Sequence, residues 1–163
     1  MKLRAYLDIE TTGLSRNYSD ITVIGIAVER NRKLEVIQLF ENTLTRNNLL
    51  RSLENINEIY TYNGSRFDLP FIKANLGIDL KEKFKHRDLM YDCWNNKLKG
   101  GLKAVEKKIG IKRKLQDIDG YMAVKLWWDY VNNNNKDALK TLLEYNKEDV
   151  VNLKVLRKKL SVK

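Results

Sequence analysis

The feature that most constrains the fold is a pair of carboxylates in an otherwise apolar segment near the N-terminus. Asp8 and Glu10 lie in a run, residues 6–10, that alternates as a β-strand does. Successive side chains of a strand point to opposite faces, so the two acids share one face and Leu7 and Ile9 share the other. Like charges on a core strand repel, and burying them costs free energy unless a counter-charge is present. Divalent cations prefer oxygen ligands and supply that charge, whereas a solvated strand end is the plainer alternative.

Composition and charge narrow the classes of protein. The chain has 163 residues, which favours a single domain over residues 1–163. Its 31 basic and 21 acidic residues give a net charge of +10, which favours nucleic acid as the partner, although Lys-rich surfaces also serve solubility. We expect no membrane partner and, by default, a cytoplasmic location, because the sequence shows neither a signal peptide nor an apolar run of about 20 residues. Cys93 is the only cysteine, which excludes an intrachain disulfide.

Hydrophobic patterning predicts an α/β domain in which strands lead and helices follow. Strands at 3–10, 21–29 and 33–40 have short connections and predict an antiparallel meander, and two more strands are expected at 58–62 and 84–88. Ser65 is the expected cap of a helix that ends at Gly77, with Asp68 as its capping-box partner. Other helices are expected at 45–53, from 90, and at 102–109, 120–131 and 137–160, the fourth of these apolar through Met122, Leu126 and Tyr130.

The last expected helix carries a second unusual acid. One face of this helix is apolar except at Asp149, and the phenol of Tyr145 lies one turn earlier, so both side chains point to the same side. A third acid, Asp68, lies between two apolar residues where a helix follows a strand. Each has an ordinary explanation: a core aromatic for Tyr145, an ion pair with Lys or Arg for Asp149, and a helix cap for Asp68.

Taken together, these residues resemble the three exonuclease motifs of the DEDD superfamily. The motifs are Asp8-x-Glu10, the segment 62–71 that contains Asp68, and Tyr145-x-x-x-Asp149. The Tyr-x-x-x-Asp form resembles the tyrosine branch (DEDDy), since Glu144 occupies the position that the histidine branch fills with His. Segments 86–89, 101–111 and 143–149 further resemble the YprB-like group of ribonuclease H-like exonucleases, so the resemblance covers essentially the whole chain.

The resemblance implies a ribonuclease H-like fold: a mixed five-stranded sheet, its first three strands antiparallel, with helices on both faces. It implies a 3′→5′ exonuclease that acts on single-stranded ends with two divalent metal ions, Mg²⁺ or Mn²⁺. Asp8 would then bridge both metals, Glu10 and Asp149 would hold the one that activates water, and Asp68 would act on the other. Tyr145 would orient the attacking water, because a phenol with an ordinary pKa near 10 is a better orienter than base.

Five further residues are candidates for substrate binding, namely Thr11, Thr12, Leu14, Asn63 and Phe67. Leu14 matches an apolar position that wedges against terminal bases in such enzymes, and a core leucine is the alternative. A turn-forming Asn and a packed Phe are the plainer interpretations of Asn63 and Phe67. A basic stretch follows at residues 97–114 and is either a phosphate-binding track or a solvated surface.

Smaller expectations concern three aromatic side chains. His86 lies outside the motifs and is expected to be structural. Trp127 and Trp128 do not fit together on one narrow helical stripe, so one is expected in the core and the other at the surface.

Two other functions share this sequence pattern. One is a non-catalytic nucleic-acid-binding module on the same fold, which would have no need for repelling carboxylates. The other is a ribonuclease H-like endonuclease or resolvase, against which Tyr145-x-x-x-Asp149 argues. The sequence leaves open DNA against RNA, the preferred metal, the oligomeric state and the partner proteins.

Overall fold

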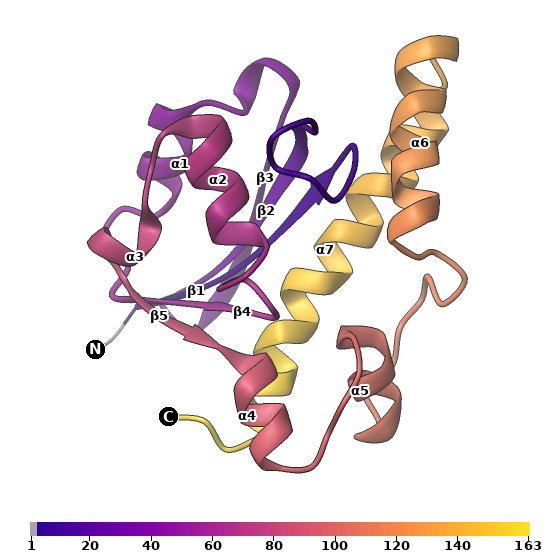
Figure 1. Ribbon diagram of the computed structural model, residues 1–163. Helices are drawn as coiled ribbons and strands as arrows, with labels where there is room; N and C mark the ends of the chain where they lie inside the picture. The colour runs from indigo at the N-terminus through magenta and orange to yellow at the C-terminus, as the bar shows by residue number, and fades with distance from the viewer. Residues whose placement is uncertain (1–2) are drawn as a thin grey trace.

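A five-stranded mixed sheet forms the centre of the protein, here described for residues 3–163 from a computed structural model (Figure 1). The strands are β1 (Arg4–Thr11), β2 (Ile21–Arg30), β3 (Lys33–Phe40), β4 (Glu58–Thr61) and β5 (Lys85–Asp88), in the spatial order β3-β2-β1-β4-β5. The first three strands are antiparallel, β4 lies parallel to β1, and β5 lies parallel to β4. The predicted α/β fold with its antiparallel first three strands is confirmed.

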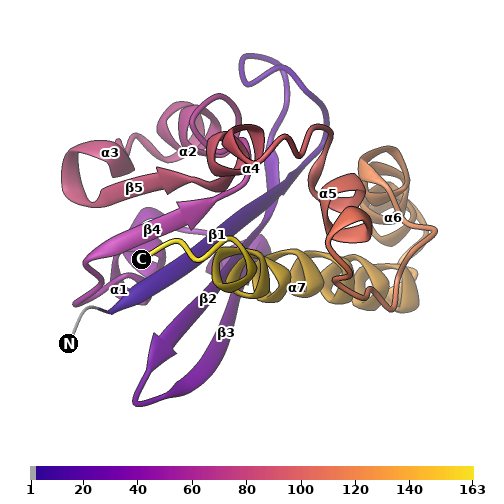
Figure 2. The ribbon, with the colours of Figure 1, turned by 90° about the horizontal axis from the view of Figure 1, so that it is seen from below.

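Helices cover both faces of this sheet. The described chain contains η1 (Glu41–Thr43), α1 (Arg46–Ser52), α2 (Asp68–Leu76), α3 (Leu80–Lys83), α4 (Leu89–Asn95), α5 (Leu102–Lys108), α6 (Gly120–Asn133) and α7 (Lys136–Lys159). Leu7 and Ile9 of β1 join a core cluster with α1, α2 and α3, whereas Tyr6 joins a second cluster with α4, α5 and α7. Alternate side chains of β1 therefore enter the two core layers on opposite faces of the sheet. Figure 2 shows α7 lying along the sheet near β1 and β2. None of the described helices is long and apolar enough to cross a membrane.

The predicted start of α2 is wrong by two residues, because the cap is Phe67 and not Ser65. The helix begins at Asp68, after Phe67, and Ser65 does not cap it. Ser65 instead donates its hydroxyl and its backbone N–H to the carboxylate of Asp88, and Asn63 has the left-handed φ of 60° that this turn requires. A strand-to-helix turn thus takes the place of the expected capping box, while Gly77 ends the helix as predicted, with φ 66°.

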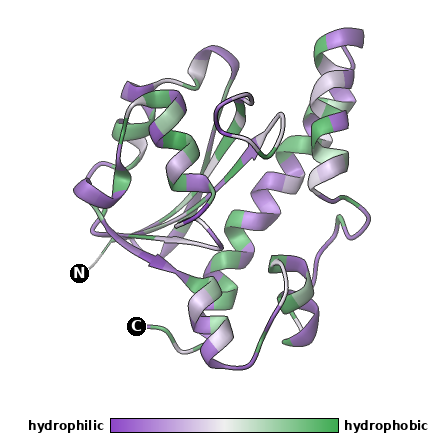
Figure 3. Ribbon diagram, viewed as in Figure 1, coloured by the Kyte–Doolittle hydropathy of each residue, from purple (hydrophilic) through white to green (hydrophobic). Residues whose placement is uncertain are grey.

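The predicted apolar face of α6 is displaced. Met122 is exposed, while Ala123 is buried and Leu126 and Trp127 pack beside it against Val23 and α7. Because α6 packs on α7 rather than squarely on the sheet, its buried stripe is narrow and shifts by one residue. Trp127 packs on the core and Trp128 is exposed. This agrees with the prediction that one of the two lies in the core and the other at the surface. Figure 3 shows hydrophobic and hydrophilic residues interspersed along α7, which contacts β1, β2 and α6.

Candidate functional site

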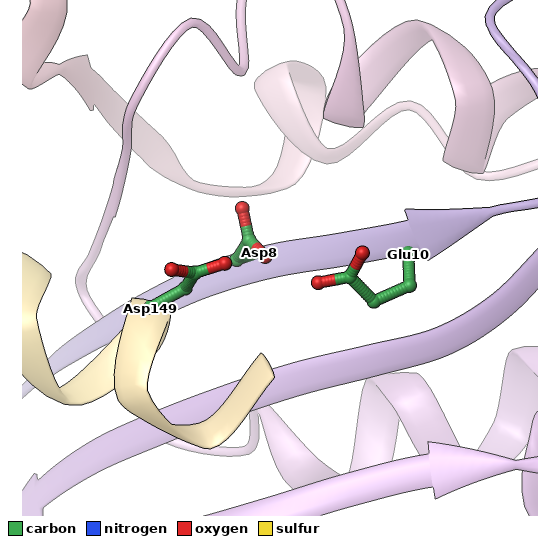
Figure 4. A group of neighbouring side chains, drawn as sticks. All are labelled: Asp8, Glu10 and Asp149. Carbon is green, nitrogen blue, oxygen red and sulfur yellow. The ribbon is translucent and has the colours of Figure 1, made fainter. Parts of the chain in front are cut away.

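Three carboxylates converge where α7 crosses β1. Asp8 and Glu10 project from β1 and Asp149 from α7, and one oxygen of each lies within 4.8 Å of the others (Figure 4). The convergence follows from the local structure, because Asp8 and Glu10 share the face of β1 on which α7 packs. Three hard oxygen donors at such spacing suit a divalent cation, and the donor set fits Mg²⁺ or Mn²⁺.

Asp68 adjoins this cluster from the first residue of α2. Its Oδ1 accepts a hydrogen bond of 3.0 Å from the backbone N–H of Ile9, the residue between Asp8 and Glu10. The pairing of β1 with β4 ends at Tyr6, so beyond it the edge of β1 that faces β4 is open to a side chain. The structure therefore brings Asp8, Glu10 and Asp149 together and places Asp68 against the backbone between the first two of them.

Burial raises the pKa of Asp8, Glu10 and Asp68. For Asp8 and Glu10 the loss of solvent is the largest cause, followed by the charge of Asp68 on Asp8 and the charge of Asp8 on Glu10. The pKa of Asp68 rises to about 7, mainly through burial, although the N–H of Ile9 opposes the shift. In the absence of a cation these three groups therefore favour protonation, and a bound cation would favour their charged forms.

Tyr145 is buried one turn before Asp149 on α7. Burial, followed by the charges of Glu10 and Asp8, raises the pKa of its phenol well above 10. The phenol is therefore protonated at neutral pH and can donate a hydrogen bond next to the acids. The ammonium of Lys103 lies 5.0 Å from the ring centre and the guanidinium of Arg113 lies 5.4 Å from it.

Asp88 supports the segment that carries Asp68, a role that the sequence did not reveal. Its carboxylate accepts hydrogen bonds from the backbone N–H groups of Asn63, Ser65 and Met90, at 2.8, 3.0 and 3.1 Å. It thereby caps α4 and fixes the turn at 63–67 that leads into Asp68. The resemblance of segment 86–89 to the YprB-like group was the signal that singled out this stretch without assigning its role.

Asn146 supports Asp8 and was also missed. Its Nδ2 donates to the backbone carbonyl of Asp8 at 3.2 Å and to the Asp8 carboxylate at 3.4 Å. Gln38 of β3 donates in turn to Asn146 Oδ1 at 2.9 Å. This fully buried amide reaches Asp8 because Gly25, opposite Asp8 on β2, has no side chain: a Cβ there would lie 2.1 Å from Asn146 Oδ1.

Arg113 is the third residue that sequence reasoning misjudged. The sequence places Arg113 in the basic stretch 97–114, which is expected to face solvent or phosphate. In the structure Arg113 is buried, and it pairs with Glu106 at 3.0 Å and with Asp149 at 2.8 Å. The six exposed basic residues of that stretch are Lys97, Lys99, Lys107, Lys108, Lys112 and Lys114. The stretch therefore combines a solvated basic surface with one internal cation.

The five predicted substrate-binding residues lie in two segments, one at the end of β1 and in the loop after it, the other in the turn before α2. Leu14 is 89% exposed, so the alternative of a core leucine is wrong. Thr11 donates its hydroxyl to Gly13 and Thr12 accepts from the N–H of Asp20, so both hydroxyls order the loop after β1. Asn63 forms the turn before α2, and the ring of Phe67 packs against that of Phe71 at a tilt, with 4.8 Å between ring centres.

His86 lies away from the acids and pairs with the hydroxyl of Thr61 at 2.8 Å. Burial lowers the pKa of His86, which favours the neutral ring. The structure thus assigns His86 a hydrogen bond between β4 and β5, as the expectation of a structural role requires.

Comparison with known proteins places this chain in a family. The model of the RNase_H superfamily matches residues 5–161. The chain belongs to the RNase_H superfamily. Among curated proteins it is 31% identical over 163 residues to the uncharacterized protein YprB of Bacillus subtilis, covering 91% of this chain and 39% of that protein.

Solved structures share the fold of this RNase_H-superfamily chain. A family B DNA polymerase from Pyrobaculum calidifontis matches 99% of this chain with a TM-score of 0.74 and 17% identity, over 25% of its own length. NrnC from Brucella melitensis, with bound Mg²⁺, matches 97% of this chain with a TM-score of 0.65 and 20% identity, over 71% of its length. The same protein bound to pGG matches with a TM-score of 0.64. The chain spans well under half the length of YprB and of the polymerase.

Proposed function

We propose that this chain is a metal-dependent 3′→5′ exonuclease of the tyrosine branch that hydrolyses phosphodiester bonds at single-stranded nucleic-acid ends. The observation that carries the proposal is the convergence of Asp8, Glu10 and Asp149 within 4.8 Å, with Asp68 alongside, on an RNase H-like sheet. The net charge of +10 suits a polyanionic substrate. The Mg²⁺ and pGG of the NrnC structures are consistent with this chemistry.

In the proposed site, Asp8, Glu10, Asp68 and Asp149 hold two divalent ions, Mg²⁺ or Mn²⁺. When bound, such ions neutralise charge on the phosphate and stabilise both the attacking and the leaving oxygen. The four carboxylates offer oxygen ligands from β1, α2 and α7, three elements that meet at one point. Asn146 donates to the Asp8 carboxylate, and Asp88 fixes the turn that leads into Asp68.

Tyr145 has the role of orienting the attacking water in this proposal. Its raised pKa keeps the phenol protonated at neutral pH, so it donates a hydrogen bond and does not act as a base. Leu14 is a candidate wedge against the terminal bases, because its side chain is almost wholly exposed in the loop after β1. Thr11, Thr12, Asn63 and Phe67 are proposed to line the same end of the site.

A substitution of Asp8 tests the proposal. Asp8→Asn keeps the size of the side chain and removes one charge from the cluster, so Mn²⁺-dependent digestion of an end-labelled oligonucleotide should fall by at least about 10³-fold. Circular dichroism and thermal unfolding verify that the variant is folded. The matched control is Asp92→Asn, which removes an acid that pairs with Arg87 outside the cluster and should leave the rate unchanged. Full activity in Asp8→Asn would refute the proposal.

A further inference from the structure

Arg113 is a buried cation in direct contact with the acidic cluster. Only about 5% of its side chain is exposed, and the side chains of its two acidic partners are 2% exposed for Glu106 and 10% exposed for Asp149. Its Nε donates to Glu106 Oε2 at 3.0 Å, and both of its terminal nitrogens contact one oxygen, Oδ1 of Asp149. The guanidinium thus bridges an acid of α5 and an acid of α7.

The loop that carries Arg113 is fixed on both sides. The backbone N–H of Ile111 donates to the carbonyl of Glu106 at 2.8 Å, and the N–H groups of Lys114 and Leu115 donate to the Glu148 carboxylate at 2.7 and 2.8 Å. The ring of Tyr145 lies against the guanidinium, 5.4 Å from centre to centre. A long, flexible side chain is therefore held in one place by its backbone, its ring contact and two ion pairs.

The charges around Arg113 are unbalanced. Asp8, Glu10 and Asp149 lie together, Asp68 adjoins them, and Glu106 adds a further buried acid. Buried acids without a counter-charge are costly, and a guanidinium in contact with Asp149 offsets part of that cost. The charges of Arg113 and Glu106 also act on the pKa of Asp8 in opposite directions, Arg113 lowering it and Glu106 raising it.

We propose that Arg113 is an internal counter-ion that positions Asp149 in the metal-free site, and that a divalent cation must compete with it for the Asp149 carboxylate. The geometry supports this because Arg113 contacts the same carboxylate that completes the three-acid cluster. The inference rests on the proposed function in one respect, namely that the acidic cluster binds divalent cations.

Removing Arg113 and removing Glu106 should change metal affinity in opposite directions. Arg113→Gln removes the competing positive charge, so the cluster should bind a cation more tightly. Glu106→Gln removes a negative charge near the cluster and leaves Asp149 as the only acid paired with Arg113, so cation binding should weaken. Simple damage to the packing would weaken binding in both variants, so the opposite signs separate a counter-ion from a structural residue.

The experiment measures Mn²⁺ affinity in the absence of nucleic acid, by calorimetric titration and by the electron paramagnetic resonance signal of free Mn²⁺. We expect Arg113→Gln to bind Mn²⁺ about tenfold more tightly than the unmodified protein, and Glu106→Gln to bind it at least about threefold more weakly. Arg113→Lys keeps the charge and should stay within about threefold of the unmodified protein.

The matched control is Arg157, a buried arginine that lies on α7, away from the loop that carries Arg113. Arg157 donates to Tyr6 Oη at 2.7 Å and to the carbonyl of Val162 at 2.8 Å, and the acid that it pairs with is Glu29, at 3.9 Å, which is not part of the acidic cluster. Arg157→Gln should lower thermal stability and leave Mn²⁺ affinity unchanged. Tighter binding in this variant would show that any loss of a buried arginine raises the affinity, and would overturn the inference.

A measurement on the unmodified protein covers the case in which Arg113→Gln does not fold. Added Mg²⁺ should shift the NMR signal of the Arg113 Nε–H group with the same dissociation constant as metal binding, while the Arg157 signal stays in place. Mg²⁺ binding without a shift at Arg113, or unchanged or weaker Mn²⁺ affinity in Arg113→Gln, would overturn the inference and leave the proposed function standing. If neither the unmodified protein nor Arg113→Gln binds Mn²⁺, the inference and the proposed function are both overturned.

Discussion

At the scale of single residues, Asp68 couples the charge of the site to the stability of the fold. Its folded-state pKa is about 7, against an ordinary value of 3.8, and burial is the main cause. The folded protein therefore holds this proton more tightly than the unfolded chain does. The stability contributed by the group is complete below about pH 4 and is lost as the pH rises through about 7, by an amount on the order of 4 kcal/mol.

Thermal unfolding of the metal-free protein tests this coupling. The Tm should fall between about pH 5 and about pH 8, and saturating Mg²⁺ should reduce the fall because it supplies the missing counter-charge. In Asp68→Asn the amide oxygen still accepts from the N–H of Ile9, but the ionisable group is gone, so the fall should be smaller. If the Tm of Asp68→Asn falls with pH as steeply as that of the unmodified protein, Asp68 does not cause the effect.

At the scale of elements, the approach of α7 to β2 depends on a single glycine. A Cβ at Gly25 would lie 2.1 Å from Asn146 Oδ1, so Gly25→Ala must displace the amide that donates to Asp8. We expect a loss of about 1–3 kcal/mol in the free energy of unfolding, measured by denaturant titration, together with slower Mn²⁺-dependent digestion. Gly120→Ala is the control, because nothing lies within 4 Å of its Cβ position.

A double mutant distinguishes this contact from a general intolerance of side chains at Gly25. Asn146→Ala removes the atoms that the new Cβ would meet, so Gly25→Ala should cost less in that background than alone. Equal costs in both backgrounds would mean that the close approach of Asn146 is not what requires glycine there.

The elements were predictable where one periodicity dominates the sequence. Alternation along β1 predicts that Asp8 and Glu10 share a face, and the four-residue spacing on α7 predicts that Tyr145 and Asp149 do. Periodicity carries no information about Arg113, which lies in a loop 36 residues before its partner Asp149. The capping-box pattern misplaced Ser65, because the distant carboxylate of Asp88 decides that turn.

At the scale of the whole molecule, we propose that the exposed lysines of residues 97–114 contact the phosphate backbone of the substrate. Replacing Lys97, Lys107 and Lys112 by Gln should weaken binding of a single-stranded oligonucleotide and reduce the slope of log affinity against log salt by about 2. Fluorescence anisotropy in the presence of chelator measures this without cleavage.

The control removes the same charge from another part of the molecule. Lys81, Lys83 and Lys85 are exposed on α3 and β5, at the end of the molecule away from α5 (Figures 1 and 2). Their replacement by Gln should change affinity and salt slope much less. Equal losses in the two triple variants would mean that net charge alone, and not the surface at 97–114, governs binding.

The central claim is best tested with two single-stranded substrates in Mn²⁺: a linear oligonucleotide labelled at its 5′ end and a closed circle of similar sequence. We propose that the acidic site hydrolyses phosphodiester bonds at a free 3′ end. Its four acids are Asp8, Glu10, Asp68 and Asp149. The account predicts a ladder of labelled products that shortens from the 3′ end, with the circle intact. Cleavage of the circle, or release of the label as a mononucleotide at the outset, would contradict it.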